Sequence, residues 1–422
     1  MIQSQPFLSR RQFLLQCNGL LAGGVVTGQQ LHGEEKKKVW KIAIHMDTAI
    51  PSLGFHGLHT AFHGLPNVDI VALFETNTKN LGQKVADTRA KRHYTDYAEL
   101  LQKESPDIVV LTSRLPNLHL EQIRQTAEKG CHIYCEKPLS AYLQEADEII
   151  KIAEQNRIKI AMAHPCRNGL GFVTMKKLIE SGKIGTPLTV QGWGKSDHRG
   201  GGEDMMTLGT HIFDLMVYLL GAPEDVTADV RVQGEPFVGP ELNKTFEDVG
   251  PVAGDEIFAT FRFAGGVRGT FESRRNLYNS KTNRMGLSVI GSKGMLSLRF
   301  SDADKEPQPL RFSNSPCAPA DESFAENIPL KEERVIPSAE PLIYTGNGLP
   351  QGPIFAEAGR FAAWDLMRSI EDDKLPVANL YDARVALEMI NGVYLSHLTK
   401  TMVKLPLADR RHPLRDFKKP TI

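Results

Sequence analysis

The sequence predicts an α/β protein with an N-terminal Rossmann-type, doubly wound parallel sheet and a C-terminal α+β domain that contains a large, mostly antiparallel sheet. In the first part of the chain, short and nearly continuous apolar runs alternate with amphipathic segments, which is the pattern of parallel strands buried under helices. Further along, apolar and polar positions alternate between glycine-rich turns, as in antiparallel hairpins. With 422 residues, the chain is also too long for a single hydrophobic core.

We therefore expect two folded domains with an extension at each end of the chain. The predicted segments are 1–34 as an N-terminal extension, 38–163 as the Rossmann-type domain, 164–405 as the α+β domain with an irregular insertion at 301–352, and 406–422 as a C-terminal tail.

The composition argues against a nucleic-acid partner and against a disulfide-stabilised fold. The chain has 50 basic and 50 acidic residues and a formal net charge of zero, so no basic surface for nucleic acid is expected. Five cysteines do not make a disulfide framework, and we interpret those after Cys17 as buried small residues.

The amino terminus has the pattern of an export signal. Arg10 and Arg11 precede Phe13-Leu14, as in twin-arginine signals, and the apolar run that follows is too short and too interrupted for a permanent membrane helix. A chance arginine pair in a disordered tail is the alternative. We expect a protein that is periplasmic or otherwise exported by the twin-arginine route.

The strands of the first domain are predicted from apolar runs separated by helical segments. They are Lys41–His45, Asp69–Glu75, Asp107–Thr112, Cys131–Cys135 and Ile158–Ala163.

The loop after the first strand departs from the usual dinucleotide pattern. A Gly-x-Gly-x-x-Gly sequence lets the backbone approach the pyrophosphate, but here glycine first occurs at Gly54 and Gly57, and Asp47 adds a carboxylate. The segment from Gly54 to Gly57 could still open a helix whose amide end holds an anion.

Glu75 is the stronger cofactor signal. An acid at the end of the second strand can accept hydrogen bonds from the ribose hydroxyls of NAD, and it would repel the 2′-phosphate of NADP. We therefore expect NAD, with NADP as the less favoured cofactor. An acidic strand end that faces water is the alternative interpretation.

Three histidines follow the first strand at helical spacing. A helix would place His56, His59 and His63 on one face, which we expect to line the cofactor cleft. A metal site is the alternative, but no carboxylate or cysteine joins them at ligand spacing, so we predict no metal.

The motif Glu136-Lys137-Pro138 follows an apolar strand and precedes a helix from about Tyr142 to Gln155. Ligands of open α/β sheets bind at the carboxyl ends of the strands, and an ammonium there can polarise a substrate oxygen. The peptide bond before Pro138 can be cis at little cost. A surface Lys–Glu pair beside a turn is the alternative.

The second domain is predicted to begin near His164. A helix to about Ser181 is followed by strands and two closing helices. The expected strands are Leu188–Trp193, Ile257–Phe263, Val267–Ser273, Leu287–Ile290 and Met295–Phe300, and the closing helices are Ile354–Ile370 and Tyr381–Thr399.

His211 and Asp214 are the candidate catalytic residues of the second domain. They lie three apart on a helix that ends at Gly221, so both project from one face. A histidine titrates near neutrality and suits a general base for alcohol oxidation. The alternatives are a core histidine and an aspartate that holds neighbouring elements together.

Two stretches resemble the Gfo/Idh/MocA family of nicotinamide-dependent sugar oxidoreductases, of which glucose-fructose oxidoreductase is an example. One is the strand–loop–helix–strand order of 106–140 that ends in Glu-Lys-Pro-Leu-Ser, and the other is Gly200-Gly201-Gly202 leading into Gly209-Thr210-His211. The resemblance implies that Lys137 and His211 flank the substrate. It further implies the remaining site residues: Thr112, Asn117, His119, Glu136 and Lys137 for the cofactor, with Gly54, Gly57 and Glu75, and Arg167, Thr207 and His211 for the substrate.

The resemblance has one departure at the catalytic set. The family commonly has an aspartate four residues before the histidine, where this chain has Thr207, which cannot balance a charge. Glu203 or Asp204 could supply the carboxylate instead.

Three functions remain open from the sequence. The first is an exported NAD-dependent oxidoreductase acting on a sugar or polyol hydroxyl. The second is a redox-neutral glycosidase or lyase that works through transient oxidation, and the third is a non-catalytic sugar-binding protein. The resemblance also implies a homo-oligomer, because the family's exposed sheet face often pairs subunits.

Overall fold

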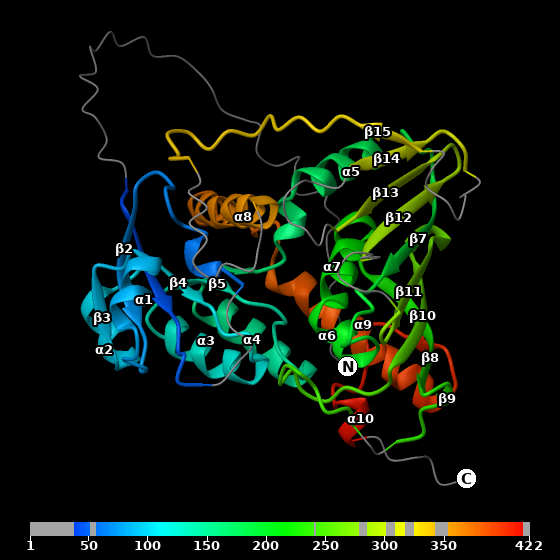
Figure 1. The fold of residues 1–422 in the computed structure, drawn as a ribbon, viewed down its shortest axis with the longest axis horizontal. Coiled ribbons are helices and arrows are strands. Elements are labelled where there is room, and N and C mark those ends of the chain that lie inside the picture. Colours follow the sequence, from blue (N-terminus) through cyan, green and yellow to red (C-terminus); the bar gives the residue numbers. More distant parts are fainter. Residues whose placement is uncertain are drawn as a thin grey trace, which may run out of the picture. The chain divides into compact units, whose positions relative to one another are not determined.

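The structure is a computed structural model that describes residues 38–50, 56–239, 242–277, 285–300, 309–316, 325–341 and 353–416. Val39–Ile422 forms one compact unit with two β-sheets (Figure 1). The predicted signal and Gly54 lie outside the described residues, and the predicted division near residue 163 stays a prediction.

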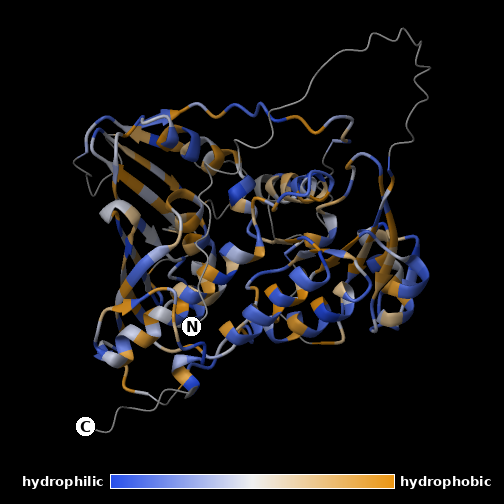
Figure 2. Ribbon diagram, turned by 180° about the vertical axis from the view of Figure 1, so that it is seen from behind, coloured by the Kyte–Doolittle hydropathy of each residue, from blue (hydrophilic) through white to orange (hydrophobic). Residues whose placement is uncertain are grey.

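The first sheet has six parallel strands in the order β3-β2-β1-β4-β5-β6, which confirms the predicted doubly wound topology. Its strands are β1 (Trp40–His45), β2 (Val68–Phe74), β3 (Arg92–Tyr94), β4 (Ile108–Leu111), β5 (His132–Cys135) and β6 (Ile160–Met162). Their residues are mostly hydrophobic, as the orange colour of these strands in Figure 2 shows, and their side chains are buried because helices cover both faces of the sheet.

One face of this sheet is covered by helices that are local in sequence. These are α2 (Tyr97–Glu104), α3 (His119–Ala127) and α4 (Leu143–Gln155), while α1 (Leu81–Thr88) follows β2. Asp96 caps α2, since its side chain accepts a hydrogen bond from the amide of Glu99. Along each strand, alternate side chains pack under these helices, as the two-residue period of a strand requires.

The other face is completed by a helix from the far end of the chain. Ala362, Ala363, Leu366 and Met367 of α8 (Pro353–Glu371) pack in one core cluster with the strands β1 and β4. In the described part of the β1–β2 connection, only the short 3₁₀ helix η2 (Leu58–Thr60) is present. Among the described residues, the segment that ends at Gly57 therefore opens only this short helix, and α8 covers this face of the sheet (Figure 1).

The second sheet has ten strands and is mostly antiparallel. The order is β15-β14-β13-β12-β7-β11-β10-β8-β16 with β9 paired to β8, and among the described pairs only β7 and β11 run parallel. Its strands are β7 (Pro187–Trp193), β8 (Pro223–Val232), β9 (Glu235–Pro236), β10 (Glu256–Phe263), β11 (Arg268–Arg274), β12 (Gly286–Gly291), β13 (Met295–Arg299), β14 (Leu310–Ser313), β15 (Glu326–Ile328) and β16 (Val403–Lys404).

Both predicted hairpins are confirmed, but the predicted irregular insertion is partly wrong. The sheet continues into this segment through β14 and β15, which pair with β13 and with each other. Their short strands and polar neighbours carry little periodicity, so sequence alone did not distinguish them from a loop.

Helices cover one face of the second sheet. They are α5 (Leu170–Glu180), α6 (Gly202–Thr207), α7 (Gly209–Leu220) and α9 (Leu380–Thr399), with α10 (Pro413–Asp416) beside α9. The helix α7 lies close to β7 at Gly192, where an added Cβ would stand 2.3 Å from a methyl group of Ile212. Gly192 therefore allows α7, which carries His211, to lie directly against the sheet.

The described part of the predicted C-terminal tail packs against both halves of the unit. Leu407 is buried, and its amide donates to Glu388 of α9 at 2.8 Å. Arg410 donates to Asp147 of α4 at 2.7 Å. None of the described helices is long and apolar enough to cross a membrane.

Candidate active site

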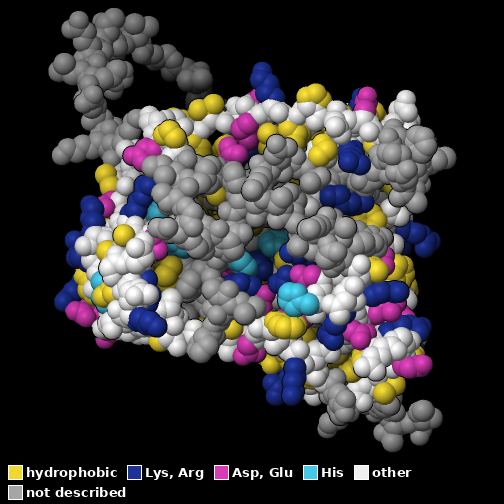
Figure 3. Space-filling view, in the orientation of Figure 1, with side chains coloured by type: hydrophobic (Ala, Val, Ile, Leu, Met, Phe, Trp, Pro, Cys, Tyr) yellow, Lys and Arg dark blue, Asp and Glu magenta, His cyan; other side chains and the backbone are white. Residues whose placement is uncertain are grey.

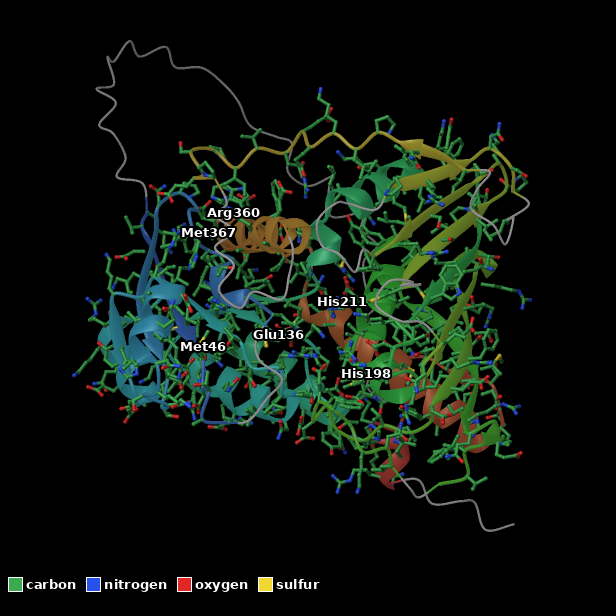
Figure 4. All side chains as sticks on the ribbon, in the orientation of Figure 1. Met46, Glu136, His198, His211, Arg360 and Met367 are labelled. Atoms are coloured by element: carbon green, nitrogen blue, oxygen red, sulfur yellow. The ribbon has the colours of Figure 1, made fainter. Side chains whose placement is uncertain are left out.

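The site is built where the carboxyl end of β5 faces the helix pair α6 and α7. Glu136 and Lys137 follow β5 directly and are 1% and 4% exposed, and the Lys137–Pro138 peptide bond is cis. The Nζ of Lys137 donates to the carbonyl oxygen of Thr207 at 2.6 Å. Lys137 thus extends from the parallel sheet to the end of α6, and Figure 4 shows Glu136 and His211 between the two sheets.

Lys137 is a buried cation, and opposing effects act on its pKa. Burial lowers the pKa of Lys137 to about 8, against the opposing attraction of the carboxylates of Glu136 and Glu247. The side chain therefore keeps most of its charge at neutral pH but loses it slightly above. Such a group is a strong electrostatic partner for an oxygen that gains negative charge.

Glu136 connects Lys137 to the first loop. Its Oε1 accepts a hydrogen bond from the amide of Lys137 at 2.9 Å, and its Oε2 lies 3.1 Å from Nδ1 of His56. Burial acts to raise the pKa of Glu136, but His56 and Lys137 outweigh it and leave that pKa lowered. Glu136 is therefore a carboxylate that orients the lysine backbone.

His211 approaches Lys137 from the first turn of α7. Its pKa is far below the usual value, mainly because of burial and also because of the positive charge of Lys137. Among the described residues, no group hydrogen-bonds its buried Nδ1. A neutral imidazole with a vacant nitrogen can accept a hydrogen bond or a proton from a ligand.

Asp214 lies one turn further along α7 and is held by two cationic or titratable partners. Its Oδ2 accepts a hydrogen bond from Nε of Arg167 at 2.8 Å, and its Oδ1 lies 3.1 Å from Nδ1 of His164. The ring of His164 stands edge-to-face with that of His211, with centroids 5.4 Å apart. These contacts favour a role for Asp214 in holding His164 and α7 in place, rather than a direct part in the chemistry.

Arg167 is likewise committed to protein partners. Besides Asp214, its guanidinium donates to Asp382 and to the carbonyl oxygen of Val377, and the residue is 2% exposed. The predicted contact of Arg167 with substrate is not favoured, because its donors are directed at these acceptors.

Thr207 contributes its backbone to the site. Its carbonyl oxygen holds Lys137, while its Oγ1 donates to the carbonyl oxygen of Glu203 at 2.8 Å. The two carboxylates considered as replacements for the missing aspartate face elsewhere. Glu203 accepts the amides of Phe246 and Glu247, and Asp204 accepts the amide of Ser196 at 3.0 Å.

Glu247 is the site carboxylate that sequence reasoning missed. It forms ion pairs with Arg114, from the loop after β4, and with Arg199, at 3.0 Å. Its charge also acts on Lys137. No motif spacing marks Glu247, because it lies in the long connection between β9 and β10 and meets Lys137 only through the tertiary fold.

Glu75 sits at the end of β2 as predicted, but its carboxylate is already occupied. The residue is fully buried and accepts hydrogen bonds from the amide and hydroxyl of Thr48, at 3.0 and 2.7 Å, and from the amide of Asn77 at 2.8 Å. The Nζ of Lys84 lies 3.0 Å from its Oε2. Glu75 therefore anchors the loop after β1, which does not favour the predicted ribose contact.

Of the other predicted cofactor residues, Thr112 and His119 are buried and bond within the protein, whereas Asn117 is exposed. The hydroxyl of Thr112 donates to the carbonyl oxygen of His45, and His119 lies between the carbonyl oxygens of Ser113 and Leu139, at 2.8 and 3.1 Å. These contacts hold the loop that carries Asn117, which is exposed, and Gly57 caps η2 with a φ of 80°. The sequence motif did not predict these hydrogen bonds of Thr112 and His119.

The three histidines after β1 do not share a helix face. His56 meets Glu136, whereas His63 Nε2 lies 3.2 Å from the carbonyl oxygen of Thr88. Burial lowers the pKa of both His59 and His63 to about 4. The expectation of a common histidine face was wrong because η2 is too short to align them. The described residues include no cluster of three or more histidine, cysteine or carboxylate ligands.

Two regions of the chain match models of one protein family. Residues 54–164 match the "oxidoreductase family, NAD-binding Rossmann fold", and residues 172–297 match the "GFO/IDH/MocA C-terminal domain". Together the two regions span more than half of the chain.

Individual relatives match shorter or longer parts of the chain. The myo-inositol 2-dehydrogenase of Thermotoga maritima is 26% identical over 56% of this chain and 69% of its own length. The 2,7-anhydro-N-acetylneuraminate hydratase of Mediterraneibacter gnavus is 29% identical over 37% of this chain and 46% of its own. Across the first relatives, the chain spans from 41% to 91% of their lengths.

The fold also matches a solved structure. Levoglucosan dehydrogenase in complex with NADH and levoglucosan superimposes with a TM-score of 0.66 and 19% identity, covering 87% of this chain and all of the other. At this identity the likeness is one of fold.

Proposed function

Because the chain belongs to the Gfo/Idh/MocA family of oxidoreductases, with an NAD-binding Rossmann fold, we propose that it oxidises a hydroxyl group of a sugar or polyol with NAD. The observation that carries this proposal is the pair formed by Lys137 and His211. A buried ammonium and a buried neutral imidazole reach the same site from the two halves of the unit. This pair suits the removal of a proton from a hydroxyl group.

The substrate class is supported by the names of similar proteins. The relative from Thermotoga maritima acts on myo-inositol, and the solved structure contains levoglucosan. Both compounds are cyclic and polyhydroxylated. The site here has a matching chemistry, since the charges of Glu136, Glu247, Arg114 and Arg199 act on Lys137. Figure 3 shows basic, acidic and histidine side chains near the middle of the face that is in view.

The residues around Lys137 fit the nicotinamide end of a dinucleotide. The vacant Nδ1 of His211 and the carboxyl end of β5 leave polar groups for a ligand where open α/β sheets bind nucleotides. Asn117, exposed beside this end of the sheet, and Lys137 would hold the cofactor. When bound, NAD supplies the acceptor for the hydride.

The protein's own residues perform the proton chemistry in this proposal. The ammonium of Lys137 draws electron density from the substrate hydroxyl and lowers its pKa. The Nδ1 of His211 then accepts the proton, while the dyad of Asp214 and His164 keeps α7 in position. Glu136 keeps the lysine backbone oriented through the bond to its amide.

The experiment is to supply the purified protein with NAD and a panel of inositols, anhydrosugars and free sugars. Formation of NADH, followed by its absorbance, is the expected result. A protein that binds sugars but no dinucleotide, measured by calorimetry and by mass spectrometry of the native protein, would contradict the proposal and favour a sugar-binding protein.

A redox-neutral reaction is the second candidate. It is favoured by one observation, the similarity to a relative that is named a hydratase rather than a dehydrogenase. In this case the oxidation would be transient and the hydride would return to the product. Conversion of a glycoside without net NADH, shown by product analysis, would distinguish this reaction from net oxidation.

We also propose export by the twin-arginine route, on the strength of Arg10-Arg11 before Phe13-Leu14. Changing Arg10 and Arg11 together to lysine should retain a folded protein in the cytoplasm, as measured by cell fractionation. Normal export of the double-lysine variant would argue against this route.

A further inference from the structure

We infer that the rim of the site binds a second sugar ring, so that the substrate is a glycoside or disaccharide rather than a free monosaccharide. The inference rests on the proposed function insofar as the substrate is a carbohydrate. It is carried by an exposed pair of aromatic rings, Phe246 and His198, beside the charged groups that surround Lys137.

The rings of Phe246 and His198 contact each other and form an aromatic platform. Phe246 and His198 meet edge-to-face with centroids 4.6 Å apart, although their side chains are 59% and 58% exposed. The amide of Phe246 donates at 2.7 Å to Oε1 of Glu203, which is almost fully buried. Single exposed apolar residues are common on protein surfaces, but a paired and anchored one is a better candidate for contact with a ligand.

The neighbours of the platform suit sugar hydroxyls. Arg199 follows His198 and bonds to Asp197 at 2.8 Å and to Glu247 at 3.0 Å. The guanidinium of Arg199 directs three of its five N–H donors at these carboxylates, which leaves donors for a sugar hydroxyl, while an aromatic face accommodates the apolar C–H surface of a sugar ring. The combination of an aromatic surface and a charged edge is therefore complementary to a pyranose.

Exposure increases stepwise from the reacting group to this platform. Lys137 is buried, and the side chains of Arg199 and Glu247, whose charges act on Lys137, are 13% and 5% exposed. The residues that directly precede these two in the chain, His198 and Phe246, are more than half exposed. If the hydroxyl of one sugar ring contacts Lys137, the platform is thus available to bind the neighbouring sugar ring.

The test is equilibrium binding by calorimetry, on the full-length protein with dinucleotide present. Cellobiose, maltose and lactose are compared with glucose and galactose. We expect at least one disaccharide to bind about tenfold more tightly than its component sugars, from the added aromatic contact. Phe246→Ala should remove this advantage while leaving the affinities for the monosaccharide and the dinucleotide unchanged.

Two variants serve as controls. Phe246→Trp should keep the preference for the disaccharide, and Phe258→Ala, which removes a 48%-exposed phenylalanine from β10, should not alter it. Equal affinity for disaccharides and monosaccharides in the wild type, or an equal loss of both in Phe246→Ala, would overturn the inference.

The outcome is separable from that of the proposed function. Oxidation of monosaccharides without any disaccharide preference would overturn the second-ring inference alone. A disaccharide preference without NAD-dependent chemistry would overturn the proposed oxidation and leave the binding subsite intact.

Discussion

Two carboxylates at equivalent places in the parallel sheet, Glu75 after β2 and Glu136 after β5, have different surroundings. Both are almost fully buried. Glu75 is bound by the fixed donors of Thr48 and Asn77 and by Lys84, all within the local βα region. Glu136 instead meets the titratable ring of His56 and the amide of Lys137, whose side chain reaches α6 of the other half.

The comparison shows that an acid at the end of a strand does not by itself indicate its task. A carboxylate whose oxygens are filled by fixed donors holds a loop, because little is gained by exchanging those bonds for a ligand's. A carboxylate beside a lysine with a shifted pKa belongs to a site whose charge can respond to a ligand. Variants at these two places can therefore test the assignment.

The largest expected effect is a loss of turnover on removal of Lys137 but not of Lys84, the lysines beside Glu136 and Glu75. Lys137→Ala should abolish turnover while the protein stays folded, because it removes the buried ammonium from the site. Lys84→Ala, the matched control at Glu75, should retain turnover at saturating cofactor. Steady-state kinetics and circular dichroism measure both. Wild-type kcat in Lys137→Ala would show that the active site has been assigned wrongly.

His211→Ala should lower kcat by ~10²–10⁴, the range for loss of a general base. The variant removes the buried imidazole whose Nδ1 is vacant in the described structure. Dinucleotide affinity, measured by fluorescence titration of NADH, should be unchanged. A wild-type rate in this variant would show that His211 is not the general base.

Glu75→Gln should lower thermal stability, by ~1–3 kcal/mol, because it weakens the buried bonds to Thr48 and Lys84. Since Glu75 serves as an anchor, the ratio of NADH to NADPH affinity should stay the same. Differential scanning calorimetry and titration with both dinucleotides measure the two effects. A ratio that shifts toward NADPH without loss of stability would restore the ribose contact that the sequence suggests.

The smallest effect is on the pH dependence of the rate. The pKa of Lys137 is about 8, so the ammonium is present below this pH and lost as the pH rises through it. The rate of the chemical step should therefore fall above about pH 8. Lys137→Arg, if active, should lack this decline, because a guanidinium stays protonated. A wild-type rate that keeps rising through this range would indicate a neutral lysine acting as the base.

Much of the fold followed from local pattern. Five of the six parallel strands, both hairpins and the end of the helix that carries His211 were predicted close to their final bounds, because hydrophobic periodicity and turn residues act within a few positions. The short strand β3 was not predicted. Lys137 and His211 could be proposed from the sequence for a similar reason, since each belongs to a motif that is contiguous in sequence. Cys131, Cys135 and Cys166 are free and buried, as predicted, whereas Cys317 lies outside the described residues.

The tertiary structure decided which groups are available for chemistry. The helix α8 covers this face of the sheet, and the described residues after β1 form only the short η2, so the local histidine spacing there did not align the three rings. Glu247 joins the site from a distant connection, while Arg167, Asp214 and Glu75 form bonds within the protein. Residue type and spacing therefore determined most of the elements and marked Lys137 and His211 as the two candidate groups. Long-range packing determined which other polar side chains already bond within the protein and which remain available to a ligand. A hydrogen-bond partner from another element cannot be predicted from the local sequence.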